Sequence, residues 1–311
     1  MGRAHASGAG VISKRGVFHS GFRRSQRETP TQKTTSVFST ARCAKCKHGG
    51  SRLIDTERPD PLDWRAMTGT RILRNDEPLA VELTAALKQG EVDRLDWLLA
   101  ANPGIAHCVV ENAKGGGRTP LHLFADWPGH NSNAVEIVRT LATAGADLDA
   151  PAVGMRHRET PLHWAASHDD VGLIDALLDA GVDIERAGSS IDGGSPLSCA
   201  VGYGQWAAAR RLVERGARTL LWHEAALGLM PAIRQRVEAD PPLQLEELSG
   251  PFWNACHGGQ LAAAQYLLAH GTDLNWHAPW SGQTPLDIAE QEGRSDIVAW
   301  LLGKGAIRGS R

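Results

Sequence analysis

Residues 160–184 of this 311-residue chain read TPLHWAASHDDVGLIDALLDAGVDI. Thr160 is a preferred helix N-cap, and Pro161 suits the first helical position, where a backbone N–H has no partner within the helix. Gly181 stands where a second helix would end, because glycine adopts the left-handed C-cap conformation without steric cost. The stretch therefore predicts two short helices joined by a polar turn.

The same pattern returns along the chain. A Thr or Ser followed by Pro-Leu stands at Thr119, Ser195 and Thr284. The distance from this residue to the closing glycine is 21 residues in the units that start at Thr160, Ser195 and Thr284. Weaker units start near Ala80, Leu220 and Gly250. One helix pair cannot bury its own apolar face, so stacked neighbours must supply the core. The sequence thus predicts an all-α array of about seven units over residues 80–311.

The Thr-Pro-Leu-His, Ala-Ala and Leu-Leu-x-x-Gly marks of this unit resemble the ankyrin repeat. The resemblance implies an ankyrin-type solenoid of helix-turn-helix repeats with short β-finger loops over residues 77–311. It also implies that His122 and His163 are structural, bonding near the helix start and tying neighbouring repeats together. The unit at Leu220 departs from the pattern, since it lacks the Thr-Pro start. Because it follows Ser195 by only 25 residues, no room is left for a full finger, and we expect an irregular junction there.

Charge divides the chain into two parts. Residues 1–76 carry a net charge of +9 and residues 77–311 a net charge of −11. The acidic array is unlike a nucleic-acid binder, whose footprint is a basic face. Residues 1–76 show no helical or strand period, and we predict a disordered basic tail. Three explanations for it stay open: a targeting segment, a basic tail that touches nucleic acid or an acidic surface, or a true start at Met67.

Catalytic and metal chemistry have only isolated candidates. Cys43 and Cys46 could begin a zinc site, but no second Cys pair follows, so we predict no metal site. His168 and His257 on inter-helix turns could serve acid–base catalysis. No nucleophile elbow or phosphate-binding loop accompanies them, and Asp170 is better explained as a helix start. We therefore expect no enzyme activity and no cofactor.

The remaining features concern the compartment. The five cysteines form no disulfide framework, and the chain has no apolar run of about 18 residues and no secretory h-region. We expect a cytoplasmic, monomeric protein without a membrane segment.

The resemblance implies that recognition lies on the concave face, through the finger tips and the ends of the first helices. Trp127, Trp276 and Trp280 fall in loops, where they are either interface anchors or covers for neighbouring helix ends. Trp97 and Trp300 fall in second helices and are predicted to pack. The inserted loop 126–133 is the first candidate for partner binding. The full set of candidate contact residues is Arg118, Asp126, Trp127, Arg156, His157, Glu159, Ser167, His168, Tyr203, His257, Trp276, Trp280, Gln283, Gln291 and Glu292.

The predicted function is a protein–protein interaction scaffold for an unidentified partner. The alternative is an enzyme or small-ligand binder that uses the His and Asp residues of the inter-helix turns.

Overall fold

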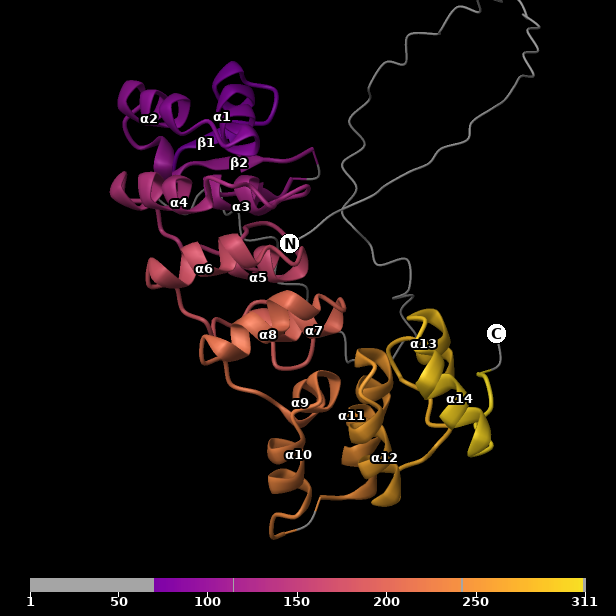
Figure 1. The fold of residues 1–311 in the computed structure, drawn as a ribbon. Helices are drawn as coiled ribbons and strands as arrows, with labels where there is room; N and C mark the ends of the chain where they lie inside the picture. The colour runs from indigo at the N-terminus through magenta and orange to yellow at the C-terminus, as the bar shows by residue number, and fades with distance from the viewer. Residues whose placement is uncertain (1–69, 114, 242, 310–311) are drawn as a thin grey trace, which may run out of the picture. The chain divides into compact units, whose positions relative to one another are not determined.

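The computed structural model describes residues 70–113, 115–241 and 243–309. Their helices come in consecutive pairs, which we call repeats 1 to 7 (Figure 1). The pairs are α1 (Pro78–Gln89) and α2 (Val92–Ala101), α3 (Pro120–Ala125) and α4 (Ala134–Thr143), α5 (Pro161–Ser167) and α6 (Val171–Asp179), α7 (Pro196–Gly202) and α8 (Trp206–Glu214), α9 (Leu221–Leu227) and α10 (Met230–Val237), α11 (Leu245–Gly258) and α12 (Leu261–Ala269), and α13 (Pro285–Gln291) and α14 (Ser295–Gly303). The predicted all-α array of about seven repeats is confirmed.

The helix ends follow the predicted capping chemistry. The Ser195 hydroxyl accepts a hydrogen bond from the Ser198 backbone N–H at 3.2 Å, and Thr284 accepts one from Asp287 at the same distance. A proline fills the first position of both helices, where no N–H is required. Gly181 follows α6 with a φ of +89°, the left-handed conformation that ends a helix.

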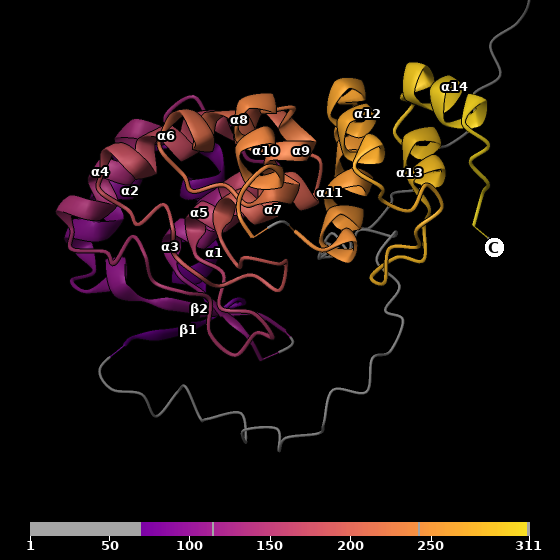
Figure 2. The same cartoon turned by 90° about the horizontal axis from the view of Figure 1, so that it is seen from below.

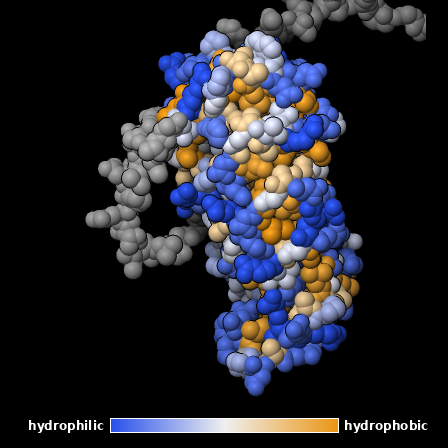
Figure 3. Space-filling view, turned by 90° about the vertical axis from the view of Figure 1, so that its left-hand side faces the viewer, coloured by the Kyte–Doolittle hydropathy of each residue, from blue (hydrophilic) through white to orange (hydrophobic). Residues whose placement is uncertain are grey.

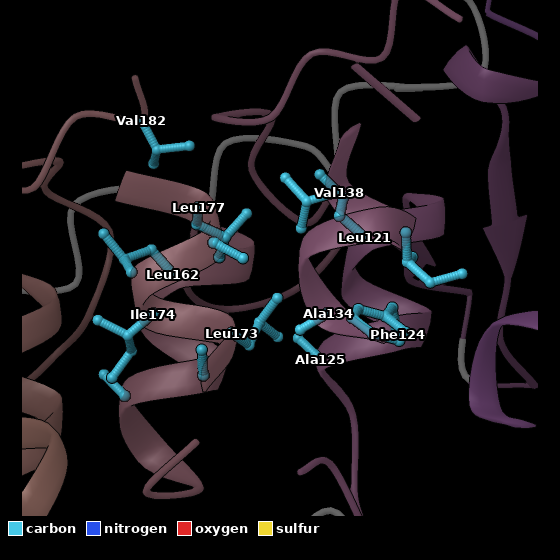
Figure 4. Packing of buried hydrophobic residues seen from close by; sticks show 14 of the residues in the cluster. Leu121, Phe124, Ala125, Ala134, Val138, Leu162, Leu173, Ile174, Leu177 and Val182 are labelled. Atoms are coloured by element: carbon cyan, nitrogen blue, oxygen red, sulfur yellow. The ribbon is translucent and has the colours of Figure 1, made fainter. Parts of the chain in front are cut away.

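The repeats pack in two layers. The second helices lie on one side and the loops between repeats on the other, with the first helices between them (Figure 2). In repeats 1 to 4 each helix packs on its counterpart in the next repeat, α1 on α3 and α2 on α4 onward. Leu162, Leu173 and Leu177 of repeat 3 are buried, and apolar side chains of repeat 2 face them (Figure 4). The hydrophobic effect along these inter-repeat contacts supplies the core.

The prediction that the whole segment 1–76 is disordered is wrong at its end, where a short strand forms. β1 (Ile72–Arg74) pairs in parallel with β2 (Val109–Glu111), which pairs antiparallel with β3 (Gly117–Arg118). The end of the segment 1–76 is therefore ordered, because buried Leu73 joins the apolar core. The predictions on residues 1–69, including the Cys43–Cys46 pair and the Met67 start, lie outside the described residues.

The junction between repeats 4 and 5 is irregular, as expected. Both helices of repeat 4, α7 and α8, pack against α9, so the pairing of each helix with its counterpart is not kept here. One cluster of buried apolar residues runs from Leu73 to Leu227, and a second runs from Ala225 to Ala306. The buried core is therefore divided into two clusters, which meet at repeat 5.

Repeat 6 starts earlier than predicted. α11 begins at Leu245 rather than near Gly250, because the Gln244 backbone N–H donates to the Glu247 carboxylate at 2.8 Å and closes a capping box. The helix continues through Pro251.

Candidate functional site

The turns after the first helices bond to the preceding or following repeat. His168 Nδ1 lies 3.1 Å from the Ala125 carbonyl oxygen, and the Ala208 backbone N–H donates to Asp169 at 2.7 Å. Asp170 caps α6 by accepting from the Leu173 N–H at 3.0 Å. These are the His and Asp groups on which a catalytic function would depend. Each has a structural partner, so the arrangement builds a stack and assembles no acid–base pair.

The repeated histidines have the structural role that was predicted. The Thr160 N–H donates to His163 Nδ1 at 3.1 Å, so the ring proton is on Nε2, which donates to the Gly194 carbonyl oxygen at 2.9 Å. His122 makes the matching bond from Nε2 to the Glu159 carbonyl oxygen at 3.0 Å. Burial lowers the pKa of His122 to about 4 and also lowers the pKa of His163. Both rings are therefore neutral links between repeats at physiological pH.

The inserted loop holds Trp127 away from the core. The Asp126 carboxylate accepts from Arg118 Nη1 at 2.9 Å, and Lys88 Nζ donates to the Trp127 carbonyl oxygen at 2.8 Å. Beyond the tryptophan, the His130 N–H donates to the Asp170 carboxylate at 2.6 Å. The Trp127 side chain is nevertheless 73% exposed. Charge-assisted bonds on both sides thus fix the backbone of a loop whose tryptophan faces solvent.

Five aromatic rings from repeats 4, 6 and the loop before repeat 7 form a continuous row. The successive ring centroids are 5.0, 5.4, 5.4 and 5.5 Å apart, with neighbouring planes inclined at 44° to 86°. Edge-to-face packing at such distances is favourable. We call this row the aromatic strip; in order it consists of Trp206, His257, Trp253, Trp280 and Trp276.

The aromatic strip brings together three of the predicted contact residues, His257, Trp276 and Trp280, and adds two that sequence reasoning missed. Trp206 starts a second helix and Trp253 lies inside a first helix. Their residue types were visible, but nothing in their spacing indicates that they share a surface.

Burial corrects part of the predicted contact set. Arg118 is 7% exposed and His257 is 6% exposed, so these side chains support the surface from below and are not available to a partner. Arg118 is buried because it pairs with Asp126, and His257 because the aromatic strip surrounds it. Trp97 differs in the other direction, since it was predicted to pack and is 54% exposed under the Arg94 guanidinium.

Of the other candidates, Ser167 and Gln291 are the last residues of α5 and α13, and the rest lie in loops and turns. The Ser167 hydroxyl donates to the His163 carbonyl oxygen at 2.8 Å, and Gln283 donates to Gln291 at 2.9 Å. Burial raises the pKa of the Glu159 carboxyl. The positions that remain exposed or half-buried are Asp126, Trp127, Arg156, His157, Glu159, Ser167, His168, Tyr203, Trp276, Trp280, Gln283, Gln291 and Glu292.

Reactive groups are not assembled elsewhere in the described part of the chain. Within residues 70–113, 115–241 and 243–309 no three His, Cys, Asp or Glu side chains are placed to hold a metal ion. Cys108, Cys199 and Cys256 are buried, and burial raises the pKa of the first two to about 12.

None of the helices in residues 70–113, 115–241 and 243–309 is both long and apolar enough to cross a bilayer. The side formed by α2, α4 and α6 is mainly hydrophilic with separate apolar patches (Figure 3).

Stacked helix pairs whose turns bond to the next pair define a tandem helical-repeat protein. A family profile described as ankyrin repeats (3 copies) matches residues 83–188, 130–221 and 221–308. The chain belongs to the ankyrin-repeat family, as its motifs indicated. Ankyrin repeats generally mediate protein–protein interaction.

Two relatives have matching segments. The B-cell lymphoma 3 protein homolog of Mus musculus is 29% identical over 196 residues, which are 62% of this chain and 37% of that protein. An ankyrin repeat and KH domain-containing protein of Caenorhabditis briggsae is 28% identical over 186 residues, 55% of this chain and 7% of that protein. The matched region thus spans well under half the length of either relative.

Proposed function

We propose that this chain is a protein-binding scaffold without catalytic activity of its own. Its partner contacts the finger face, by which we mean the loops between repeats together with the turns that follow the first helices. The observation that carries this proposal is Trp127, a 73% exposed tryptophan on a loop fixed at both ends.

Exposure of such a side chain has an energetic cost that a partner can recover. Transfer of apolar surface from water is worth roughly 25 cal/mol per Å². Binding also pays little ordering entropy here, because the loop backbone is already held by Lys88 and Asp170. A rigid, exposed aromatic residue is the type that dominates protein interfaces.

The alternative of an enzyme using the turn histidines has less support. His168 and Asp170 are engaged in bonds that define the stack. His168 donates from Nδ1 to the Ala125 carbonyl oxygen and keeps a lone pair on Nε2, but among the described residues it makes no hydrogen bond to a nucleophilic or acidic side chain that would complete a catalytic pair. We therefore place function in partner binding.

The test is affinity capture from the native lysate with the immobilised full chain. Three baits are compared: the parent, Trp127→Ala, and Trp97→Ala as the matched control, since Trp97 is also an exposed tryptophan but lies on a second helix. We expect a protein retained by the parent and the control and reduced at least about tenfold by Trp127→Ala. Equal retention by all three baits would remove Trp127 and its loop from the proposal.

A further inference from the structure

The aromatic strip has a hydrogen-bond donor with no acceptor. Trp253 is 6% exposed, and its indole Nε1–H is buried with no partner in the described part of the chain. A buried donor left unpaired costs free energy that a suitable acceptor would restore. Trp280, 44% exposed on a loop, packs edge-on over this ring at 5.4 Å. Trp280 is therefore an exposed neighbour whose rotation would uncover part of the Trp253 ring.

One end of the strip is positively charged. The Arg294 guanidinium lies 5.9 Å from the centre of the Trp206 ring, and its Nε donates to the His257 carbonyl oxygen at 3.2 Å. Among the described residues Arg294 forms no ion pair with a carboxylate. A ligand with a negative charge at this end would complement it, whereas a cationic ligand would be repelled.

We propose that the tryptophans of the aromatic strip, supported from below by His257, bind an extended, proline-containing peptide segment of a partner protein, with an acidic residue of that segment beside Arg294. This proposal rests on the protein-binding function above and names the chemistry of the partner.

The polyproline II conformation fits the strip in three respects. It has no internal hydrogen bonds, so its carbonyl groups are free to accept from Trp253. Its prolines pack well on aromatic faces, and aromatic surfaces of other folds recognise it in this way. One turn rises about 9 Å, and neighbouring rings of the strip lie 5.0 to 5.5 Å apart, so one turn of such a peptide is long enough to contact more than one ring.

The probe is a fluorescein-labelled peptide, Glu-Pro-Pro-Leu-Pro-Pro-Asp, titrated with the full chain and followed by fluorescence anisotropy. Two matched peptides are run beside it, one with every proline replaced by alanine and one with both acids replaced by lysine. We expect the acidic proline peptide to bind at least about tenfold more tightly than either.

Four protein variants test the assigned residues. Trp253→Phe keeps a ring but removes the donor, and should weaken binding about three- to tenfold. Trp280→Ala should weaken it at least about tenfold, because the loss of an aromatic face for the prolines outweighs the easier access to Trp253. Arg294→Gln should abolish the preference for acidic over lysine-bearing peptide while retaining the preference for proline, an effect that misfolding would not produce. Trp97→Phe, on α2, should change nothing.

Several outcomes would overturn the proposal: no anisotropy change at concentrations up to about 1 mM, equal affinity for the alanine peptide, tighter binding of the lysine peptide, or unaltered binding by both Trp253→Phe and Trp280→Ala. If lysate capture depends on Trp127 while the peptide fails, the scaffold function stands and only the partner chemistry is wrong. If the peptide binds but Trp127→Ala does not reduce lysate capture, the proposed partner chemistry stands and the role of Trp127 in the scaffold function is wrong.

Discussion

Repeats 3 and 5 build the same helix pair with different side chains. In repeat 3 the buried His163 accepts from the Thr160 N–H and donates to the Gly194 carbonyl oxygen of the following finger. In repeat 5 His223 accepts from the Leu220 N–H at 3.0 Å, but its Nε2 lies 3.2 Å from the Ser198 hydroxyl of the preceding repeat. The histidine caps the helix in both cases, and its second bond runs in opposite directions along the stack.

The second difference between repeats 3 and 5 is a buried carboxylate in repeat 5. The position of Trp164 in repeat 3 is held by Glu224 in repeat 5, whose side chain is 1% exposed. Glu224 accepts from Arg236 Nε at 2.8 Å and from the Thr219 hydroxyl at 2.7 Å. Arg236 also donates to the Thr219 carbonyl oxygen at 2.7 Å. Where the chain has no room for a finger, an ion pair connects the junction to both helices of the repeat.

The largest effect should come from removing the cation of this junction. Arg236→Ala leaves the Glu224 carboxylate buried without its charge partner, and we expect a loss of about 3 kcal/mol in the free energy of unfolding. This is the low end of the range for buried pairs, because Arg236 itself is 45% exposed. Urea denaturation followed by circular dichroism measures the change.

The matched control lies in the regular half. Arg211→Ala removes the pair with Asp175, in which both side chains are about one third exposed, and should cost under about 1 kcal/mol. The double variant Glu224→Leu with Arg236→Met should recover part of the loss, since no buried charge remains. Equal losses for Arg236→Ala and Arg211→Ala would mean that the junction does not depend on its ion pair.

Acid should weaken repeats 2 and 5 through their buried histidines, His122 and His223. Burial lowers the pKa of His122 to about 4 and that of His223 to about 3, against an ordinary value near 6.5. The unfolded chain therefore binds protons that the folded chain refuses, so stability is complete above pH 6.5 and falls as pH drops toward 4. Each histidine should account for a loss on the order of 2–3 kcal/mol between pH 7 and pH 4.5.

His223→Gln isolates this contribution, because the amide can accept from Leu220 and donate to Ser198 without titrating. Its unfolding free energy should fall less steeply with acid than that of the parent. Parallel pH curves for the two proteins would show that His223 gains a proton as easily when folded as when unfolded.

The sequence predicts what local chemistry determines. Thr160, Pro161 and Gly181 act on their own helix ends, so the repeats could be counted without a structure. The start of α11 could not be located in this way, since Gln244 is a weaker capping signal than Ser or Thr.

The candidate site was only partly predictable for a related reason. The inserted polar loop marked Trp127 as a candidate, but the sequence left open whether its ring is exposed or covers a helix end. The aromatic strip depends on how repeats 4 to 7 meet across the irregular junction, which places Trp206 beside His257. That geometry is tertiary and leaves no periodic trace in the sequence.

The close approach of repeats 5 and 6 gives a smaller effect. A Cβ added at Gly258 would lie 1.9 Å from the Ala226 carbonyl oxygen of α9, so Gly258→Ala must push α9 and α11 apart. We expect a loss of about 2 kcal/mol, typical of overpacking against a fixed backbone. Gly250→Ala in the same helix is the control: its Cβ meets nothing within 4 Å, and the variant should gain about 0.5–1 kcal/mol. If Gly258→Ala raised the free energy of unfolding as Gly250→Ala is expected to do, the two helices would lie farther apart than in the structure.

The smallest effect concerns the end of the regular repeat. Gly181 has a φ of +89° and open space around it, so Gly181→Val meets no neighbour and its cost is conformational alone. A β-branched residue disfavours the left-handed region, and we expect a loss of about 1–2 kcal/mol, measured as a lower urea midpoint. Gly181→Asn, which tolerates this conformation, should lie close to the parent. Because repeat 3 reaches its stability through caps and turns while repeat 5 reaches it through a buried pair and tight packing, the loss at Gly181 should stay below those at Gly258 and Arg236. A larger loss at Gly181 would reverse that ranking and make the C-cap the more sensitive part of the stack.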